Sequence, residues 1–211
     1  MTMLFLLEMM LKTDFLGKLL YPQLLWSLPA GKEEIFITFD DGPHPEISPE
    51  VLTILDKFGA KATFFCVGHN VEKFPDTYRE IISNGHQVGN HTFNHLKGWE
   101  TSDNVYFENV KKCRQLVDSK LFRPPHGRIK RSQIKFLKNE YKIAMWSVLS
   151  YDFSKKVSKE KCLQISLKYT KDGSIVVFHD SVKAADNMLY ALPLFLEHFK
   201  RKGFTFKALT A

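Results

Sequence analysis

Short runs of apolar residues alternate along the chain with longer segments in which apolar residues recur every three or four positions. The short runs are rich in β-branched and aromatic side chains and are typical of strands buried on both faces of a sheet. The longer segments have the spacing of amphipathic helices. Because the two kinds of segment alternate, the pattern predicts an α/β fold made of βαβ units around a parallel sheet.

The individual elements follow from this pattern and from the residues that end each run. Strands are expected at 35–39, 61–67, 86–90, 121–123, 143–149 and 174–178, and helices at 49–58, 78–84, 102–117, 132–139, 158–169 and 189–202. Ser48 and Pro49 predict the start of the first helix, with Ser48 as its N-cap, and Gly59 is its expected stop. Residues 68–70 are expected to form a loop.

The first 33 residues are predicted to form a segment of their own. The leucines at 16, 19, 20, 24 and 25 have the spacing of an amphipathic helix, broken near Pro22, that covers the rest of the fold or contacts a membrane surface. A cleaved signal peptide is not expected, because residues 1–10 lack a basic region and a cleavage site and Glu8 and Lys12 interrupt the apolar run. Nor is a spanning helix expected, since no uninterrupted apolar stretch reaches about 18 residues.

Composition favours one globular domain: the chain has 211 residues, of which 44% are hydrophobic. Its net charge is +7, but the lysines are dispersed, which indicates solvated faces, and no nucleic-acid recognition motif is found.

Cys66, Cys113 and Cys162 have no Cys-x-x-Cys spacing and are expected to be reduced core thiols. The protein is expected to be a monomer, and to be either cytoplasmic or associated with a membrane or the cell envelope.

Two adjacent carboxylates, Asp40 and Asp41, end the first strand and enter a Gly42–Pro43 turn. Side chains of a strand point alternately to opposite faces, so these two diverge unless the turn re-aims one of them. Two carboxylates this close repel each other, and burying them is costly without a cation. A bound cation is therefore expected, although an ordinary turn capped by Asp is the alternative.

His91 and His95 are separated by four residues, a spacing that places two imidazoles on one face of a helix within reach of one metal ion. By itself this spacing is more often found on a surface than at a metal. Combined with the Asp pair, it favours a site of two histidines and one aspartate with open positions for water and substrate, which is typical of a catalytic metal.

Four segments resemble the ordered motifs of the polysaccharide deacetylase (NodB-homology) family. They are Thr38-Phe39-Asp40-Asp41-Gly42-Pro43, His91-Thr92-Phe93-Asn94-His95, Arg123-Pro124-Pro125-His126-Gly127 and Val177-Phe178-His179-Asp180. The resemblance covers residues 34–211, and so divides the chain into the N-terminal segment 1–33 and a catalytic domain. It implies an irregular parallel (β/α) barrel, seven-stranded as in NodB, and a metal-dependent hydrolase that removes N-acetyl or O-acetyl groups from glycans containing N-acetylglucosamine.

The resemblance also implies the main roles in the site. Asp40 is the expected catalytic base and His179 the expected general acid, while Asp41, His91 and His95 are the expected metal ligands. Zinc is the expected metal, because histidine and carboxylate ligands at an open site suit it, and cobalt, nickel or manganese are alternatives.

Further residues are expected to support this chemistry. Arg123 is expected to orient Asp40 through paired hydrogen bonds. Asp152, in preference to Asp180, is expected to raise the pKa of His179.

The substrate side of the site departs from the family in two places. The backbone N–H of His126 is the expected second oxyanion donor, where relatives often carry Tyr. Phe153 stands where relatives carry Trp, and it is expected to supply an apolar wall. Pro124 and Val177 complete the expected substrate-binding residues.

The sequence leaves several functions open. The acetylated glycan could be peptidoglycan, a chitin-like oligomer or an O-acetylated xylan. Other classes are a glycan-binding protein without turnover and a metal-dependent hydrolase of a small non-sugar amide. Presence of both an expected base and an expected acid favours an enzyme over a binding protein.

Overall fold

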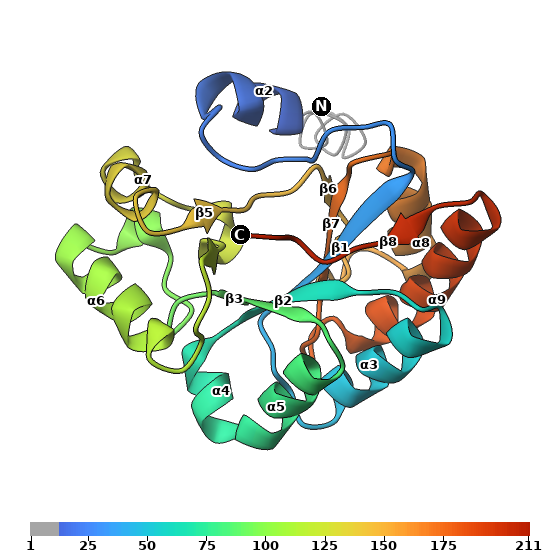
Figure 1. Cartoon of the computed structure of the whole chain (residues 1–211), viewed down its shortest axis with the longest axis horizontal. Helices are drawn as coiled ribbons and strands as arrows, with labels where there is room; N and C mark the ends of the chain where they lie inside the picture. The colour runs from blue at the N-terminus through green and yellow to red at the C-terminus, as the bar shows by residue number, and fades with distance from the viewer. Residues whose placement is uncertain (1–12) are drawn as a thin grey trace.

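A computed structural model describes residues 13–211, and the expectations for residues 1–12 lie outside this range. Its centre is a curled, parallel sheet with the strand order β5-β4-β3-β2-β1-β7-β6, and β8 pairs with β1 outside this path (Figure 1). The predicted parallel α/β barrel architecture is therefore confirmed, with seven strands along the main path of the described chain.

The described strands and helices alternate as the sequence pattern predicts. The strands are β1 Glu34–Asp40, β2 Ala62–Cys66, β3 Gln87–Asn90, β4 Leu121–Phe122, β5 Lys142–Ile143, β6 Val148–Leu149, β7 Ile175–His179 and β8 Thr205–Phe206. The α-helices are α2 Thr13–Leu20, α3 Ile47–Lys57, α4 Gly68–Lys73, α5 Pro75–Ser83, α6 Asp103–Arg114, α7 Arg131–Leu137, α8 Lys159–Tyr169 and α9 Ala185–Arg201. Single 3-10 turns occur at Gly98–Glu100 and Pro125–Gly127.

The central strand β1 is buried on both faces. Ile35, Ile37 and Phe39 pack in the cluster shared with the helices, and Phe36 packs with Phe65 and Leu121 of the neighbouring strands. It pairs in parallel with β2 and β7, and its last residue, Asp40, lies opposite Phe65 on one side and His179 on the other. Parallel strands present their carboxyl ends at the same edge of a sheet. The register therefore brings Asp40 and His179 to this edge from positions far apart in the sequence.

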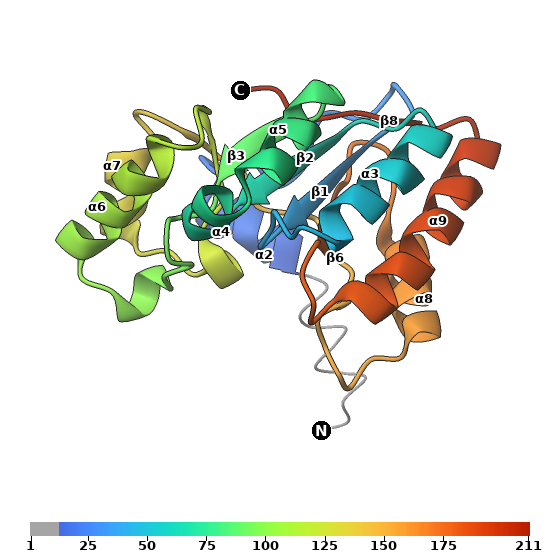
Figure 2. The ribbon, with the colours of Figure 1, turned by 90° about the horizontal axis from the view of Figure 1, so that it is seen from below.

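Helices α3, α8 and α9 lie side by side on one flank of the sheet, as Figure 2 shows. The largest buried cluster joins them to the sheet through aromatic rings: Phe39 stacks on Phe64 with centroids 4.9 Å apart, and Phe178 packs edge-on against Phe195. Fully burying one such side chain stabilises a fold by about 1.5–3 kcal/mol. This cluster gives the site a rigid support.

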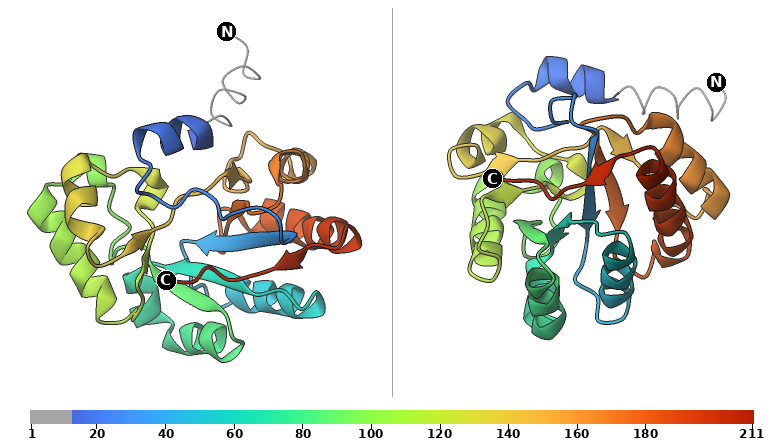
Figure 3. Two further views of the ribbon diagram at one scale, coloured as in Figure 1. Left: turned by 45° about the horizontal axis from the view of Figure 1, so that its top comes forward. Right: turned by 45° about the vertical axis from the view of Figure 1, so that its right-hand side comes forward.

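The segment after α2 fills the gap between the two ends of the sheet. Leu25 donates its N–H to the carbonyl of Ile143 (2.9 Å) and accepts from the N–H of Met145 (2.7 Å), and Leu28 donates to the carbonyl of Gly173 (2.8 Å). Residues 25–28 thus connect the β5 side to the residues before β7. Figure 3 shows α2 on the opposite side of the strands from α3, α4 and α5.

Helix α2 ends at Leu20, before Pro22, and leaves Leu19 and Leu20 exposed, whereas Leu24 is buried. Within residues 13–211, no helix has the length and apolar character needed to cross a membrane.

Three local predictions are wrong. Ser48 is not an N-cap: α3 begins at Ile47, and the Ser48 hydroxyl instead donates to Asp180 Oδ2 (2.5 Å) and accepts from the N–H of His44 (2.9 Å). Residues 68–70 open helix α4 instead of forming a loop.

The third wrong prediction is the single strand at 143–149, which is two short strands, β5 and β6. Between them, the carbonyls of Ala144 and Met145 accept hydrogen bonds from the side chain of Arg123. A carbonyl directed toward a buried guanidinium is not available to a sheet ladder on that side, so the strand is interrupted there.

Candidate active site

The two carboxylates of the first motif separate at the end of β1. Asp41 has a φ of 81°, in the left-handed region that aspartate tolerates better than most residues. Its conformation is held by Asn70, whose amide donates to the Asp41 carbonyl (2.7 Å), and by Gly42, whose N–H donates to Asp180 Oδ1 (3.0 Å). As a result Asp40 and Asp41 both line one cavity.

The two histidines lie on a loop and not on a helix, although the argument from their spacing assumed helical geometry. Within residues 91–95, Thr92 and His95 have φ values of 62° and 56°, which no right-handed helix contains. Asn109 of α6 holds this loop: its Oδ1 accepts two loop N–H groups at 2.8 and 3.0 Å, and its Nδ2 donates to Asn94 Oδ1 at 2.8 Å. The pair is nevertheless brought together, with ring centroids 5.1 Å apart.

Asp41, His91 and His95 form a group that fits one metal ion, because one ligand atom from each lies within 4.8 Å of the others. Asp41 Oδ1 is 3.0 Å from His95 Nε2 and 3.7 Å from His91 Nε2. His91 Nδ1 lies 2.8 Å from the carbonyl of Arg123, which can only accept, so Nδ1 carries the proton and Nε2 has the free lone pair. Such an outer hydrogen bond is the usual way to orient a metal-binding imidazole.

The protonation states of His91 and Asp41 also suit metal binding. Burial lowers the pKa of His91 to about 4, so its imidazole is neutral at pH 7. Burial alone would raise the pKa of Asp41, but the hydrogen bond with His95 and the charges of the nearby histidines outweigh it and hold that pKa well below its usual range. A neutral imidazole and an ionised carboxylate are the forms that bind a metal ion.

Arg123 is fully buried and directed at Asp40. Its Nη1 donates to Asp40 Oδ1 and to Thr38 Oγ1, both at 2.7 Å. Its other nitrogens donate to the carbonyls of Ala144 (3.1 Å) and Met145 (2.9 Å). With these partners the guanidinium cannot rotate away. It fixes Oδ1 of Asp40, while Oδ2 has no hydrogen bond from any side chain or backbone group of residues 13–211.

His179 is held by Asp152 through two contacts. Its Nδ1 lies 2.7 Å from Asp152 Oδ1, and its backbone N–H donates to Asp152 Oδ2 at 2.7 Å. Burial by itself would lower the pKa of His179, but the charge and hydrogen bond of Asp152 raise it to about 9. The alternative partner, Asp180, is engaged by the turn after β1 instead, through Gly42 and Ser48.

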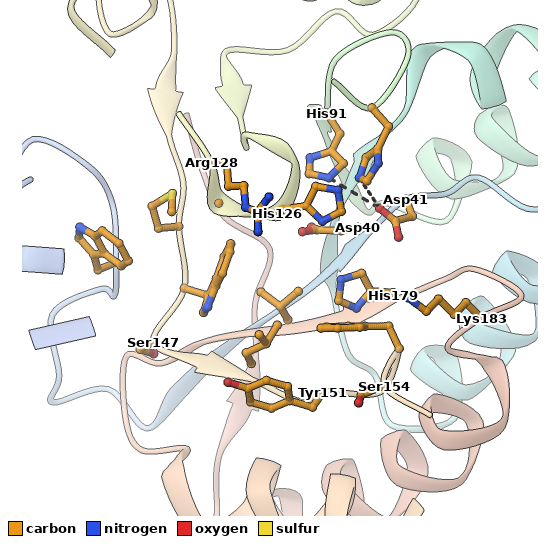
Figure 4. A pocket seen from close by; sticks show the side chains of 18 residues that line it. Asp40, Asp41, His91, His126, Arg128, Ser147, Tyr151, Ser154, His179 and Lys183 are labelled. Atoms are coloured by element: carbon orange, nitrogen blue, oxygen red, sulfur yellow. Dashed lines mark ion pairs between the residues drawn. The ribbon is translucent and has the colours of Figure 1, made fainter. Parts of the chain in front are cut away.

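These groups open into one cavity of about 600 Å³, shown in Figure 4. Of the expected site residues, the following line it: Asp40, Asp41, His91, His95, His126, Phe153, Val177 and His179. Arg123, Pro124 and Asp152 are buried outside its lining; Arg123 contacts the lining residue Asp40, and Asp152 contacts the lining residue His179.

The two departures from the family lie on the cavity wall. The His126 side chain is exposed, with its ring edge-on to His95 at 4.7 Å between centroids, and burial of part of the ring lowers its pKa. The Phe153 ring lies edge-on to His179 at 5.0 Å.

Several lining residues were not found from the sequence. Trp26, Trp146 and Tyr151 form much of the aromatic wall, and Arg128 and Lys183 add two cationic side chains. Nothing in their sequence context marks the aromatic residues as site residues. Thr38 does not line the cavity but accepts a hydrogen bond from Arg123, and it did carry a signal, because it is the one polar residue within the apolar run of β1.

A parallel α/β barrel with ionisable side chains at the carboxyl ends of its strands has the arrangement of a barrel enzyme.

Comparison with known proteins also indicates an enzyme. The sequence profile of the polysaccharide deacetylase family matches residues 27–142. A peptidoglycan-N-acetylglucosamine deacetylase of Bacillus cereus is 32% identical over 189 residues, 86% of this chain and 88% of the relative. A chitooligosaccharide deacetylase of Azorhizobium caulinodans is 32% identical over 162 residues, 72% of this chain and 76% of the relative.

Solved structures give the same result. A peptidoglycan N-acetylglucosamine deacetylase in complex with 4-naphthalen-1-yl-N-oxidanyl-benzamide superimposes with a TM-score of 0.85 and 31% identity, covering 92% of this chain and 94% of that one. A pseudoenzyme of the same family from Bacillus anthracis shares the fold with a TM-score of 0.76 at 22% identity. The chain belongs to the polysaccharide deacetylase family, and it is a hydrolase of carbon–nitrogen bonds other than peptide bonds.

Proposed function

We propose that the protein removes N-acetyl groups from N-acetylglucosamine units of a polysaccharide, with peptidoglycan as the first candidate substrate. The observation that carries the proposal is the presence of Asp40 with Arg123 and of His179 with Asp152 around one cavity. An amide hydrolase needs a group that accepts a proton from water and a group that donates one to the leaving nitrogen. The names of the relatives support the choice of substrate.

Asp40 would accept the proton of the attacking water at Oδ2. Arg123 occupies Oδ1 at 2.7 Å and keeps the carboxylate in one orientation, so that a single oxygen is presented to the cavity. A positioned base of this kind contributes about 10²- to 10⁴-fold to the rate.

His179 would donate its proton to the nitrogen that leaves. Because Asp152 holds Nδ1, Nε2 is the nitrogen available to the cavity. The raised pKa of about 9 keeps the imidazole protonated at neutral pH, which is the form that a general acid requires. The Phe153 ring, at an angle of 76° to the imidazole, would supply an apolar neighbour on one side of His179.

Asp41, His91 and His95 would hold a divalent transition metal ion, with zinc the first candidate for this donor set. When bound, such an ion supplies Lewis-acid polarisation of the acetyl carbonyl. The N–H of His126, on the adjoining wall, is the proposed second donor to the oxyanion.

Acetate release distinguishes this function from the others that the sequence left open. The protein is incubated with peptidoglycan, N-acetylglucosamine oligomers and O-acetylated xylan, each with and without added zinc, and acetate is measured. We expect release from the two N-acetylated glycans and its loss in the Asp40→Asn variant. Binding of these glycans without release of acetate would show a glycan-binding protein, and the proposal would then be wrong.

A further inference from the structure

The side of the active-site cavity next to His179 carries an exposed cation. Lys183 lines the cavity, and its ammonium group lies over the Phe153 ring, 5.4 Å from the ring centroid. That ring is in turn edge-on to His179. Figure 4 shows Lys183 on the His179 side of the cavity and Arg128 on the other side. A positive charge therefore lies close to the proposed general acid.

Two further lysines lie in the loop between β6 and α8. Lys155 and Lys156 directly follow Ser154, which lines the cavity. Both side chains are exposed. Consecutive Cα atoms are 3.8 Å apart, so these two lysines begin within a short distance of the cavity wall.

Helix α9 holds this loop beside the segment that carries Lys183. The Nδ2 group of Asn187 donates to the carbonyls of Asp152 and Val157, both at 3.0 Å. Lys159, the first residue of α8, lies over the ring of Tyr190 of α9, 4.9 Å from the centroid. The two segments are thus adjacent, and they form a lysine rim that consists of Lys155, Lys156, Lys159 and Lys183.

The charge of the lysine rim is not neutralised within the described chain. Its four side chains are exposed, and none forms an ion pair with another residue of 13–211. Glu160 and Asp186 are the carboxylates closest to the rim in sequence, and neither pairs with it. Arg128, across the cavity, differs because it is paired with Glu100 at 3.2 Å. Like charges gathered on one surface repel each other, so a bound anion would stabilise the rim.

The position of the lysine rim indicates where such an anion comes from. Lys183 lines a concave cavity, which a ligand chain can enter and a flat membrane surface cannot. Lysine binds anions as a point charge on a flexible stem, without the fixed geometry of arginine. The rim therefore suits anionic groups whose position varies along a polymer that occupies the cavity.

We propose that the lysine rim binds carboxylate groups carried by the glycan chain, so that the enzyme selects acidic polysaccharides over neutral ones. The proposal rests on the proposed function, since it places the same glycan in the cavity. Attraction between the rim and the carboxylates would favour association, while Asp40 and His179 act in the same way on either kind of substrate. Peptidoglycan, whose peptide side chains carry carboxylates, would be preferred to a chitin-like oligomer, which has none.

The test uses one glycan in two charge states. Soluble peptidoglycan fragments are compared with the same fragments after their carboxylates have been converted to amides, and the measured quantity is the ratio of the two kcat/KM values. We expect the unsubstituted protein to prefer the acidic fragments by about tenfold at low salt. The preference should disappear in about 1 M salt, which screens charges over about 3 Å. In the triple variant Lys155→Gln, Lys156→Gln, Lys183→Gln, the ratio should be close to one at every salt concentration.

The matched control removes three lysines elsewhere. Lys111→Gln, Lys135→Gln, Lys138→Gln changes the net charge by the same amount, and these residues are exposed and do not line the cavity. They lie on α6 and at α7, which Figure 1 shows on the opposite side of the molecule from α8 and α9. This variant should keep the preference for acidic fragments. An unchanged ratio in the rim variant, or an equal loss in the control, would overturn the proposal.

Binding provides a readout that does not depend on turnover. Calorimetry measures the affinity of the Asp40→Asn protein for both kinds of fragment, and an affinity about tenfold weaker for the amidated fragments supports the proposal. Equal affinities, together with rim-dependent binding to phosphatidylglycerol vesicles, would assign the lysines to a membrane surface and overturn it. If the unsubstituted protein releases no acetate from either substrate, the proposed function fails, while calorimetry still decides whether the rim binds carboxylates.

Discussion

Asp40 and Asp41 are neighbours in the sequence but have different partners in the structure. Asp40 lies against the buried guanidinium of Arg123, whereas Asp41 faces the imidazoles of His91 and His95. The left-handed backbone at Asp41 produces this separation. One carboxylate is thereby suited to proton transfer and the other to metal binding.

Replacing Asp40 by Asn tests the first of these roles. We expect kcat to fall by about 10²- to 10⁴-fold, because the amide cannot accept the proton of water. Metal content should be retained, since the carbonyl oxygen of Asn still accepts from Arg123 and the group Asp41, His91 and His95 is untouched. Steady-state kinetics and elemental analysis on the same preparation give both values. A variant with near-normal kcat would show that Asp40 is not the base.

The pH dependence of activity tests the role of His179. Its pKa of about 9 predicts that kcat/KM declines as the pH rises through about 9, because the acid is then deprotonated. Asp152→Asn removes the charge that raises this pKa and leaves the burial that lowers it. The alkaline limb should therefore move to a lower pH, although the charges of Asp41 and Asp40, which also raise this pKa, remain.

The control for this shift is Asp186→Asn, an exposed residue in the first turn of α9, which should leave the profile unchanged. Thermal melts of both variants establish that they are folded. An alkaline limb that stays near pH 9 in folded Asp152→Asn would exclude His179 as the acid.

At the scale of elements, the sequence predicted the strands and helices that are determined by the local apolar pattern. It failed where hydrogen bonds to residues distant in the chain determine the conformation. The buried strands β1 and β7 follow from their continuous apolar runs, and the amphipathic helix α9 follows from its apolar periodicity. The break between β5 and β6 depends on Arg123, and the loop at 91–95 depends on Asn109, both distant in the chain. A window of neighbouring residues contains no information about such partners.

Asn109 is therefore expected to control metal binding although it is not a ligand. Asn109→Ala removes three hydrogen bonds that hold the loop carrying His95 in its left-handed conformation. Loss of outer contacts of this kind typically weakens metal affinity by about 10- to 100-fold. Competition with a chromogenic chelator measures the affinity.

Asn104→Ala on the same helix serves as the control for Asn109→Ala, because its side chain is exposed. Equal zinc affinity in both variants and in the unsubstituted protein would mean that the loop keeps its conformation without Asn109.

At the scale of the whole molecule, the segment at 24–28 contributes both to the fold and to the cavity. Trp26 is 9% exposed, its ring packs against Gly17 of α2, and it also lines the active-site cavity. The sequence motifs located the aspartates and histidines that line the cavity, but they could not locate this wall. Trp26 reaches the cavity only because residues 25–28 bridge β5 and the start of β7.

Trp26→Ala is expected to lower the free energy of unfolding by about 3–5 kcal/mol, the usual cost of truncating a buried Trp. Trp99→Ala should cost only about 1 kcal/mol, because Trp99 is 61% exposed and contributes mainly one hydrogen bond to the carbonyl of Ile129. Urea unfolding followed by circular dichroism compares the two. Similar losses in both would show that residues 24–28 do not stabilise the barrel.

Deacetylation is proposed to depend on a metal ion bound by Asp41, His91 and His95. The most direct measurement is acetate release from N-acetylglucosamine oligomers by protein stripped with a chelator, before and after addition of zinc, with bound metal determined on the same samples. We expect the stripped protein to be inactive, zinc to restore activity with one ion per chain, and His91→Ala to bind little zinc and stay inactive. Full acetate release by the stripped protein, or equal zinc content in His91→Ala and the unsubstituted protein, would contradict the account.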